Sequence, residues 1–240
     1  MPKISITHND LHIWKLYLSK MGNDTEEFYR NSLSQDEKER ADKLRFQTDR
    51  NNFLMARGYL RNLLSTYLGK EPQEIELRYG RYGKPCLSKE SNPDNISFNL
   101  SHSHGISFYA LTKDRGIGID IEYIRPVSRA HKIIDRFFSD EEIDYYERQP
   151  REKKLQTFFM LWCRKEAYTK ARGTGFNLPA RNIDISFVTG EKKKIKDMRD
   201  NGSPTLGIYE ITIDPGYAAS LAVSGINPQI SYRDIERTDY

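Results

Sequence analysis

Hydrophobic positions recur with helical spacing in two long stretches of the chain. Over residues 49–68 the apolar side chains follow a period of three to four residues that ends at Gly69, which predicts a long amphipathic helix. Residues 155–172 repeat this pattern and end at Gly173. Before this second stretch, residues 139–142 (Ser-Asp-Glu-Glu) match a capping box and predict a short helix.

Other segments alternate with a period of two and predict strands. In residues 96–101 the apolar side chains are expected to face inward, whereas Ser97, Asn99 and Ser101 face outward. Residues 107–111 and 116–122 follow closely, which favours an antiparallel meander of three strands. Further strands are predicted over residues 183–187, 206–213 and 217–223.

Each half of the chain therefore offers helices followed by a small sheet. This arrangement predicts an α+β fold with two similar subdomains that meet near residues 113–125. We place the boundary between residues 115 and 116, so that the N-terminal subdomain covers residues 1–115 and the C-terminal one residues 116–240.

The composition is that of a folded, rather polar chain. Of its 240 residues 37% are apolar, and 38 Lys and Arg against 34 Asp and Glu give a net charge of +4. Cys86 and Cys163 suit neither a disulfide framework nor a structural zinc site. Because no stretch reaches the roughly 18 apolar residues of a membrane span and no signal peptide is evident, we expect a cytoplasmic protein.

Positive charge gathers in residues 36–61. Within this segment Arg50, Arg57 and Arg61 are predicted to share one side of the first long helix. Such a side can be a solvated helix face, or it can bind phosphate or an acidic partner.

Two carboxylates and two glycines share one face of the strand predicted over residues 116–122. Asp120 and Glu122 lie about 6.5–7 Å apart at Cα, close enough to share one hard cation. Gly116 and Gly118 leave this face open to a ligand. An edge strand whose charged side chains prevent pairing with another chain would explain the carboxylates but not the glycines, so a metal site is favoured.

Two further groups of residues are candidates for chemistry. Glu166 and Lys170 lie one helical turn apart, a spacing that by itself indicates only a stabilising surface pair. Ser101 and His102 end a predicted strand and suit phosphate binding better than hydrolysis, because no nucleophile elbow surrounds the serine. Walker-type and dinucleotide-binding glycine loops are absent from the sequence.

Short motifs stand in a fixed order over residues 34–223. They are Tyr82-Gly83-Lys84-Pro85, Phe98-Asn99-Leu100-Ser101-His102-Ser103, Gly118-Ile119-Asp120-Ile121-Glu122, Phe137-Phe138-Ser139 with Glu141 and Glu142, and Trp162-Cys163-Arg164-Lys165-Glu166-Ala167-Tyr168-Thr169-Lys170 leading to Gly173-Thr174-Gly175. Together they resemble the 4′-phosphopantetheinyl transferases of the larger, surfactin type. That resemblance implies a monomeric pseudo-dimer with coenzyme A bound in the cleft between two subdomains.

The resemblance also implies a reaction. Phosphopantetheine leaves coenzyme A for a serine of an acyl or peptidyl carrier domain, and adenosine 3′,5′-bisphosphate is released. A divalent cation and cationic side chains would stabilise the charge that builds on the pyrophosphate. Fatty-acid, polyketide, siderophore and peptide-antibiotic carriers all fit this chemistry.

Site residues follow from the same resemblance. Asp120, Glu122 and Glu166 match magnesium ligands, with Mn²⁺ equally compatible, and Asp120 also counts among the coenzyme-binding residues. Glu166 is expected to take the serine proton, directly or through a metal-bound water. Lys170, as a catalytic and coenzyme-binding residue, and Lys165 are expected to contact phosphates.

The remaining coenzyme contacts are expected from the first half of the chain. Ser101 and His102 match phosphate contacts, and the motif of Gly83, Lys84 and Pro85 matches the loop on the adenine side. Arg40 matches a cation near the 3′-phosphate, with Lys43 and Arg45 as alternatives. At Glu37 the chain departs from the family, whose model member has a lysine there.

Two other functions fit parts of the pattern. The carboxylates alone would also suit another metal-dependent phosphoryl transferase. The basic helix alone would suit a non-catalytic module that binds coenzyme A or RNA, but no clear patch of exposed aromatic residues interleaved with the basic ones is evident for stacking bases. We therefore expect a transferase that binds neither nucleic acid nor membrane.

Overall fold

The computed structural model describes residues 3–18, 23–175, 180–185, 196–197, 205–225 and 227–234. The helices are α1 (Asn23–Asn31), α2 (Gln35–Asp42), α3 (Gln47–Leu68), α4 (Ala130–Phe137), α5 (Asp140–Glu147) and α6 (Arg151–Arg172), with 3₁₀ turns η2 (Pro72–Glu74) and η4 (Ala180–Asn182). The strands are β1 (Asp10–Tyr17), β2 (Leu77–Tyr79), β3 (Pro85–Leu87), β4 (Ile96–Ser103), β5 (Ile106–Lys113), β6 (Ile117–Tyr123), β7 (Ile183–Asp184), β8 (Lys196–Asp197), β9 (Leu206–Glu210), β10 (Tyr217–Ser224) and β11 (Gln229–Asp234).

The long helices confirm the helical periodicity. Helices α3 and α6 each span 22 residues and end at Gly69 and Gly173, whose left-handed φ angles of 66° and 67° suit glycine. The capping box is also confirmed at the start of α5. There Ser139 Oγ accepts a hydrogen bond from the Glu142 amide at 3.1 Å, and Glu142 Oε2 accepts one from the Ser139 amide at 2.8 Å.

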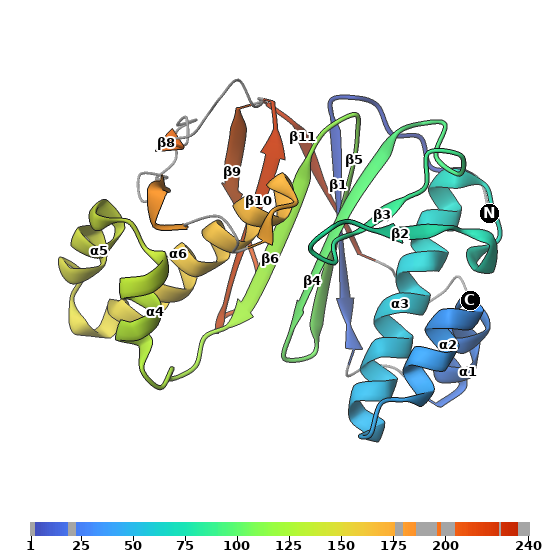
Figure 1. Cartoon of the computed structure of the whole chain (residues 1–240), viewed down its shortest axis with the longest axis horizontal. Coiled ribbons are helices and arrows are strands. Elements are labelled where there is room, and N and C mark those ends of the chain that lie inside the picture. The colour runs from blue at the N-terminus through green and yellow to red at the C-terminus, as the bar shows by residue number, and fades with distance from the viewer. Residues whose placement is uncertain are drawn as a thin grey trace.

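Two sheets lie at the centre of the molecule, with orders β11-β1-β5-β4 and β6-β10-β9. In Figure 1 they are flanked by α1–α3 on one side and by α4–α6 on the other. The sheets pack face to face through apolar residues of both halves, Leu11, Ile13, Phe108, Ile117, Ile119 and Leu221 among them. This mixed arrangement of helices and sheets confirms the α+β prediction.

The predicted three-strand meander is only partly right. Strands β4 and β5 form the expected antiparallel hairpin, but β6 pairs with β10. On its other side β6 faces β4, where the amide of Ile119 donates to Asn99 Oδ1 at 2.8 Å and that of Tyr123 to Ser103 Oγ at 3.1 Å. Side chains thus replace a main-chain ladder, so Asn99 and Ser101 are buried although the alternation placed them outward.

The two halves repeat one topology. In each, a strand (β1 or β6) is followed by a 22-residue helix, a 3₁₀ turn, a short two-stranded sheet and two strands, and the first strand pairs with the last. The boundary at residues 115 and 116 stays a prediction. Strand β11 lies beyond it and pairs in parallel with β1, so the first sheet contains a strand from the C-terminal half.

The strands predicted in the C-terminal part of the chain agree with the structure only in part. Strands β9 and β10 form the expected antiparallel pair. Of the strand predicted over 183–187 only Ile183–Asp184 is a strand, and residues 186–187 lie outside the described residues.

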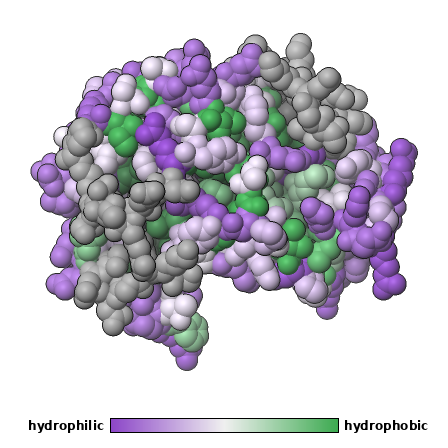
Figure 2. Space-filling model, turned by 180° about the vertical axis from the view of Figure 1, so that it is seen from behind, coloured by the Kyte–Doolittle hydropathy of each residue, from purple (hydrophilic) through white to green (hydrophobic). Residues whose placement is uncertain are grey.

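None of the helices in the described ranges has the length and apolar character that crossing a membrane requires. The face shown in Figure 2 is largely hydrophilic, with hydrophobic residues interspersed.

Gly118 brings β6 against α6. A Cβ atom added to Gly118 would lie 2.1 Å from the carbonyl oxygen of Ala167 and 2.4 Å from the amide nitrogen of Ala171. The expectation that the strand glycines leave room for a ligand is therefore wrong, because the backbone of α6 fills the space at Gly118 and comes within 3.3 Å of a Cβ at Gly116.

We expect Gly118→Ala to lower the free energy of unfolding by about 1–3 kcal/mol, because the helix must shift away from the added methyl group. Gly80→Ala is the matched control, since its Cβ would be no closer than 3.6 Å to the nearest atom. Urea denaturation of both variants measures the difference. Equal stability of the two variants would contradict the close packing of α6 on β6.

Candidate active site

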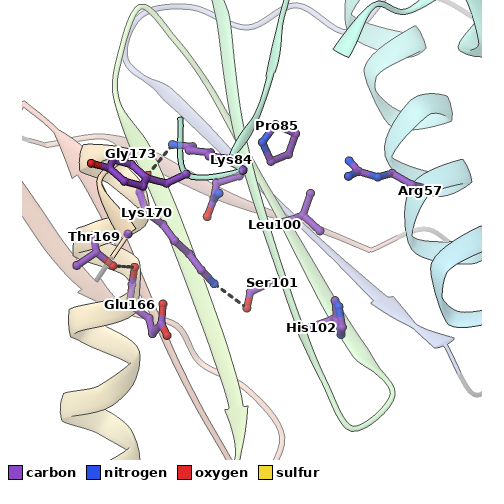
Figure 3. Close-up of a pocket in the computed structure, with 14 residues that line it drawn as sticks. Arg57, Lys84, Pro85, Leu100, Ser101, His102, Glu166, Thr169, Lys170 and Gly173 are labelled. Atoms are coloured by element: carbon purple, nitrogen blue, oxygen red, sulfur yellow. Dashed lines mark hydrogen bonds between the residues drawn. The ribbon is translucent and has the colours of Figure 1, made fainter. Parts of the chain in front are cut away.

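A cavity of about 430 Å³ lies between β4, the first residues of β3 with the loop before them, and the C-terminal half of α6. Its lining includes the predicted residues Gly83, Lys84, Pro85, Ser101, His102, Glu166 and Lys170. Figure 3 shows Lys170 reaching from α6 toward Ser101 on β4, with Glu166 one turn away on the same helix. The fold therefore brings together residues that are far apart in the sequence.

Asp120 is the most buried carboxylate of this group, with 3% of its surface exposed. Its Oδ1 accepts hydrogen bonds from Lys170 Nζ at 2.7 Å and from Ser101 Oγ at 2.9 Å. Its Oδ2 is buried and has no hydrogen-bond partner among the described residues, since the nearby Cys163 thiol is directed to the Ala218 carbonyl at 3.3 Å. One oxygen of Asp120 is thus available to a further cation.

The negative charge of Asp120 affects the pKa values of the other two predicted metal ligands, Glu122 and Glu166. Burial, assisted by the charges of Asp120 and Glu122 and opposed by Lys170, raises the pKa of Glu166 to about 7. Burial and Asp120 likewise raise the pKa of Glu122, whose Oε2 accepts a hydrogen bond from Ser103 at 3.2 Å. Clustered carboxylates that repel one another are stabilised by a divalent cation.

The donor set therefore fits a hard cation. Carboxylate oxygens are the ligands that Mg²⁺ and Mn²⁺ prefer, and Asp120 offers a buried oxygen without a partner. As the side chains stand, no three His, Cys, Asp or Glu residues of the described part of the chain already form a metal-holding group. Lys170 occupies the other Asp120 oxygen, so this lysine and a metal ion would share the carboxylate.

Lys84 connects the loop between β2 and β3 to the second half of the chain. Its Nζ donates to the carbonyl oxygens of Ile117 and Lys170, both at 2.7 Å. Burial, together with the nearby positive charge of Lys170, lowers the pKa of Lys84 to about 8. The Lys84 ammonium therefore fixes the end of α6 to this loop, while Gly83 and Pro85 line the cavity beside it.

Lys165 is not among the residues that line the cavity. Its side chain is 1% exposed, and its Nζ contacts Glu142 Oε2 at 2.9 Å and the carbonyl oxygens of Ala180 and Ile183 at 2.7 Å. This placement corrects the prediction that Lys165 contacts a phosphate, because its ammonium is enclosed by protein acceptors.

The basic residues of α2 and α3 are distributed differently from the prediction. Arg40 stacks on Phe53 with its guanidinium 5.4 Å from the ring and does not line the cavity. Arg57, which was predicted to lie on a basic side of the helix but was not among the predicted coenzyme contacts, does line it. Arg57 lies 3.5 Å from Glu37 and donates to the Tyr79 hydroxyl at 3.1 Å. Its helical spacing from other arginines was its only signal in the sequence.

Comparison with known proteins identifies the family of this chain. Residues 116–222 match the model of the 4′-phosphopantetheinyl transferase superfamily, and residues 23–112 match that of the N-terminal part of a 4′-phosphopantetheinyl transferase. The chain belongs to this family. It is thus a transferase of the class that uses coenzyme A and acts on carrier proteins.

Two of the relatives cover almost the whole chain, and a third covers about half of it. The 4′-phosphopantetheinyl transferase HetI of Nostoc sp. is 33% identical over 95% of this chain and 93% of its own length. The 4′-phosphopantetheinyl transferase Sfp of Bacillus subtilis is 27% identical over 96% of this chain and 98% of its own. The 4′-phosphopantetheinyl transferase AcpT of Salmonella typhi is 40% identical over 47% of this chain and 56% of its own.

The raised pKa of Glu166 predicts a pH-dependent stability. Without divalent cations the folded chain keeps the Glu166 proton up to about pH 7, whereas the unfolded chain loses it near the ordinary value of 4.5, so stability falls as the pH rises between them. We expect Glu166→Gln to remove this fall and to stabilise the metal-free protein by up to about 3 kcal/mol at pH 8.

Urea denaturation from pH 4.5 to 8 in the presence of a chelator measures this difference. Glu141→Gln, a change at an exposed residue of α5, is the control and should follow the wild-type curve. Parallel curves for Glu166→Gln and the wild type would show that burial and neighbouring charge leave Glu166 unaffected.

Proposed function

We propose that Asp120, Glu122 and Glu166 hold Mg²⁺, or Mn²⁺ in its place, while the chain transfers phosphopantetheine from coenzyme A to a carrier protein. The observation that carries this proposal is the buried Asp120 carboxylate. One of its oxygens is bound by Lys170 and Ser101 and the other has no partner among the described residues. Two more carboxylates with raised pKa values stand near enough to feel its charge.

Coenzyme A would occupy the cavity between β4 and α6. Ser101, His102 and Lys170 present a hydroxyl, an imidazole and an ammonium to its pyrophosphate, and Arg57 adds a guanidinium on the side of α3. Gly83 and Pro85, in the loop held by Lys84, support the adenine side. Cationic and hydrogen-bonding groups around one cavity are what a polyphosphate ligand requires.

The chemical step follows from this arrangement. The hydroxyl oxygen of the carrier serine forms a bond to the β-phosphorus of coenzyme A, and the bond between that phosphorus and the bridging oxygen breaks. The leaving adenosine 3′,5′-bisphosphate takes the electron pair. Glu166 accepts the serine proton, since a carboxylate beside a divalent cation is ionised at neutral pH and is therefore available as a base.

The surrounding groups would stabilise the charge that develops during this step. The Lys170 ammonium points between Asp120 and Ser101, so a short movement would bring it to a pyrophosphate oxygen. A divalent cation, when bound, would supply further positive charge to the pyrophosphate. The buried position of Asp120 strengthens these interactions, because screening by water is reduced there.

One chain should suffice for this activity. Its two halves already pack sheet against sheet, as two subunits would, which supports a monomer. Both cysteines are free thiols, which suits a cytoplasmic protein. We also propose that the basic segment of residues 36–61 serves the carrier protein and coenzyme A, and that neither nucleic acid nor a membrane is a partner.

Mass spectrometry of an apo carrier protein tests this proposal. After incubation with coenzyme A and Mg²⁺, the wild-type chain should add one phosphopantetheine, and Asp120→Ala should slow the transfer by a factor of 10² or more, about 3 kcal/mol in the barrier. The Asp120→Ala protein should remain folded because removing one of several like charges relieves repulsion. Undiminished transfer by Asp120→Ala would contradict the assignment of the metal site.

The position of the 3′-phosphate can be tested with two arginines. Because Arg57 lines the cavity and Arg40 does not, we expect Arg57→Ala to reduce the preference for coenzyme A over dephospho-coenzyme A about tenfold or more. Arg40→Ala is the matched basic control and should keep the wild-type preference. The KM values for coenzyme A and dephospho-coenzyme A measure this preference. If Arg40→Ala reduced the preference and Arg57→Ala did not, the 3′-phosphate contact would belong to Arg40, as its match to the family implied.

A further inference from the structure

The internal repeat places the same kind of buried cation in both halves of the chain. Arg61 precedes Gly69 at the end of α3 by the same eight residues that separate Lys165 from Gly173 at the end of α6. Both side chains are almost fully buried, with 2% and 1% exposed. The two cations are therefore structural equivalents, although only Lys165 adjoins a site residue in the sequence.

Both cations are enclosed in the same way. Arg61 is bound by the Glu37 carboxylate and donates to the carbonyl oxygens of Pro72 and Ile75 at 2.8 and 2.9 Å. Lys165 is bound by the Glu142 carboxylate and by the carbonyl oxygens of Ala180 and Ile183. In each half the carboxylate belongs to the third residue of a helix that follows a serine, and the carbonyls belong to residues in or next to a 3₁₀ turn.

The enclosure leaves Lys165 no hydrogen for a substrate. An ammonium has three donors, and Lys165 directs all three to Glu142, Ala180 and Ile183. Glu142 is itself fully buried and also accepts the amides of Ser139 and Ile185 at 2.8 and 2.9 Å. We call the Glu142 carboxylate and the carbonyl oxygens of Ala180 and Ile183 the cage of Lys165. Removal of the Lys165 ammonium from this cage would leave the buried Glu142 carboxylate without its counter-charge.

We propose that Lys165 is a positioning residue: its cage sets the rotation of α6 and so directs Glu166 toward Asp120. Successive residues of an α-helix point about 100° apart, so fixing Lys165 on one side fixes the direction of Glu166 on the next. Gly118 holds the helix against β6, and the cage with α5, η4 and β7 prevents it from turning there. This inference rests on the proposed metal site, because it concerns how Glu166 reaches that site.

Three variants separate positioning from other roles. Lys165→Met removes the ammonium, Lys165→Arg substitutes the cation that the first half uses, and Glu142→Gln/Lys165→Met removes both charges, so that a folded protein is available even if the single change unfolds the chain. Arg61→Met is the matched control, since it breaks the equivalent cage far from Glu166 along the chain. Circular dichroism gives the folded fraction for each.

Two measurements are made on each folded variant. Mn²⁺ titration in the presence of coenzyme A, followed by electron paramagnetic resonance, gives the metal affinity, and carrier modification gives kcat and KM. We expect Lys165→Met and the double variant to weaken Mn²⁺ binding and lower kcat, each about tenfold or more, with KM for coenzyme A within about twofold. Lys165→Arg should recover most of both losses, and Arg61→Met should keep the wild-type Mn²⁺ affinity.

Other results would overturn the inference. A KM for coenzyme A raised about tenfold at unchanged Mn²⁺ affinity would make Lys165 a coenzyme contact. Wild-type Mn²⁺ affinity and kcat per folded molecule in Lys165→Met and the double variant would make the cage merely structural. Failure of the proposed function looks different, because then the wild-type chain would bind no Mn²⁺ with coenzyme A, or Asp120→Ala would bind it equally well.

Discussion

Between β4 and β6 the two halves of the chain meet through side-chain hydrogen bonds in place of a main-chain ladder. Asn99 and Ser103 accept amides of β6 from one direction, and Lys84 and Lys170 donate to its carbonyl oxygens. Because side chains of β4 stand between the two backbones along this seam, polar groups gather where an ordinary sheet would have main-chain hydrogen bonds. The buried Asp120 bonds across this seam to Ser101, which also lines the cavity.

The seam also explains the electrostatics of the site. Carboxylates on β6 and α6 lie near one another in partly buried surroundings, which raises the pKa values of Glu122 and Glu166. Lys170 forms a direct ion pair only with the third carboxylate, that of Asp120. This arrangement lowers the stability of the free protein. It favours the binding of a divalent cation together with a polyphosphate, because the cation offsets the carboxylate charges and the polyphosphate offsets the lysine charge. The apolar core between the two sheets holds the halves together despite this cost.

Local patterns in the sequence predicted the parts of the fold that depend on local structure. The periods of α3, α6 and β4 are clear because apolar and polar residues recur at regular spacing there, although β5 is buried on both faces, and the glycine ends have a conformational cause. Strand β1 gave no such signal because it is buried on both faces, and the pairing of β11 with β1 joins opposite ends of the chain. The polar side of β4 was misplaced because alternation does not show that a second subdomain covers it.

The candidate site could be predicted only through its motifs, because spacing does not tell which way each side chain points. Glu166 and Lys165 are neighbours in one motif, yet Glu166 lines the cavity and Lys165 is enclosed by Glu142 and two carbonyl oxygens. The most direct test is a crystal structure with coenzyme A and Mg²⁺. The account predicts the metal ion on Asp120, Glu122 and Glu166, the pyrophosphate on Lys170 and Ser101, and Lys165 still bound to Glu142. A pyrophosphate outside this seam, or a metal ion held without Asp120, would contradict it.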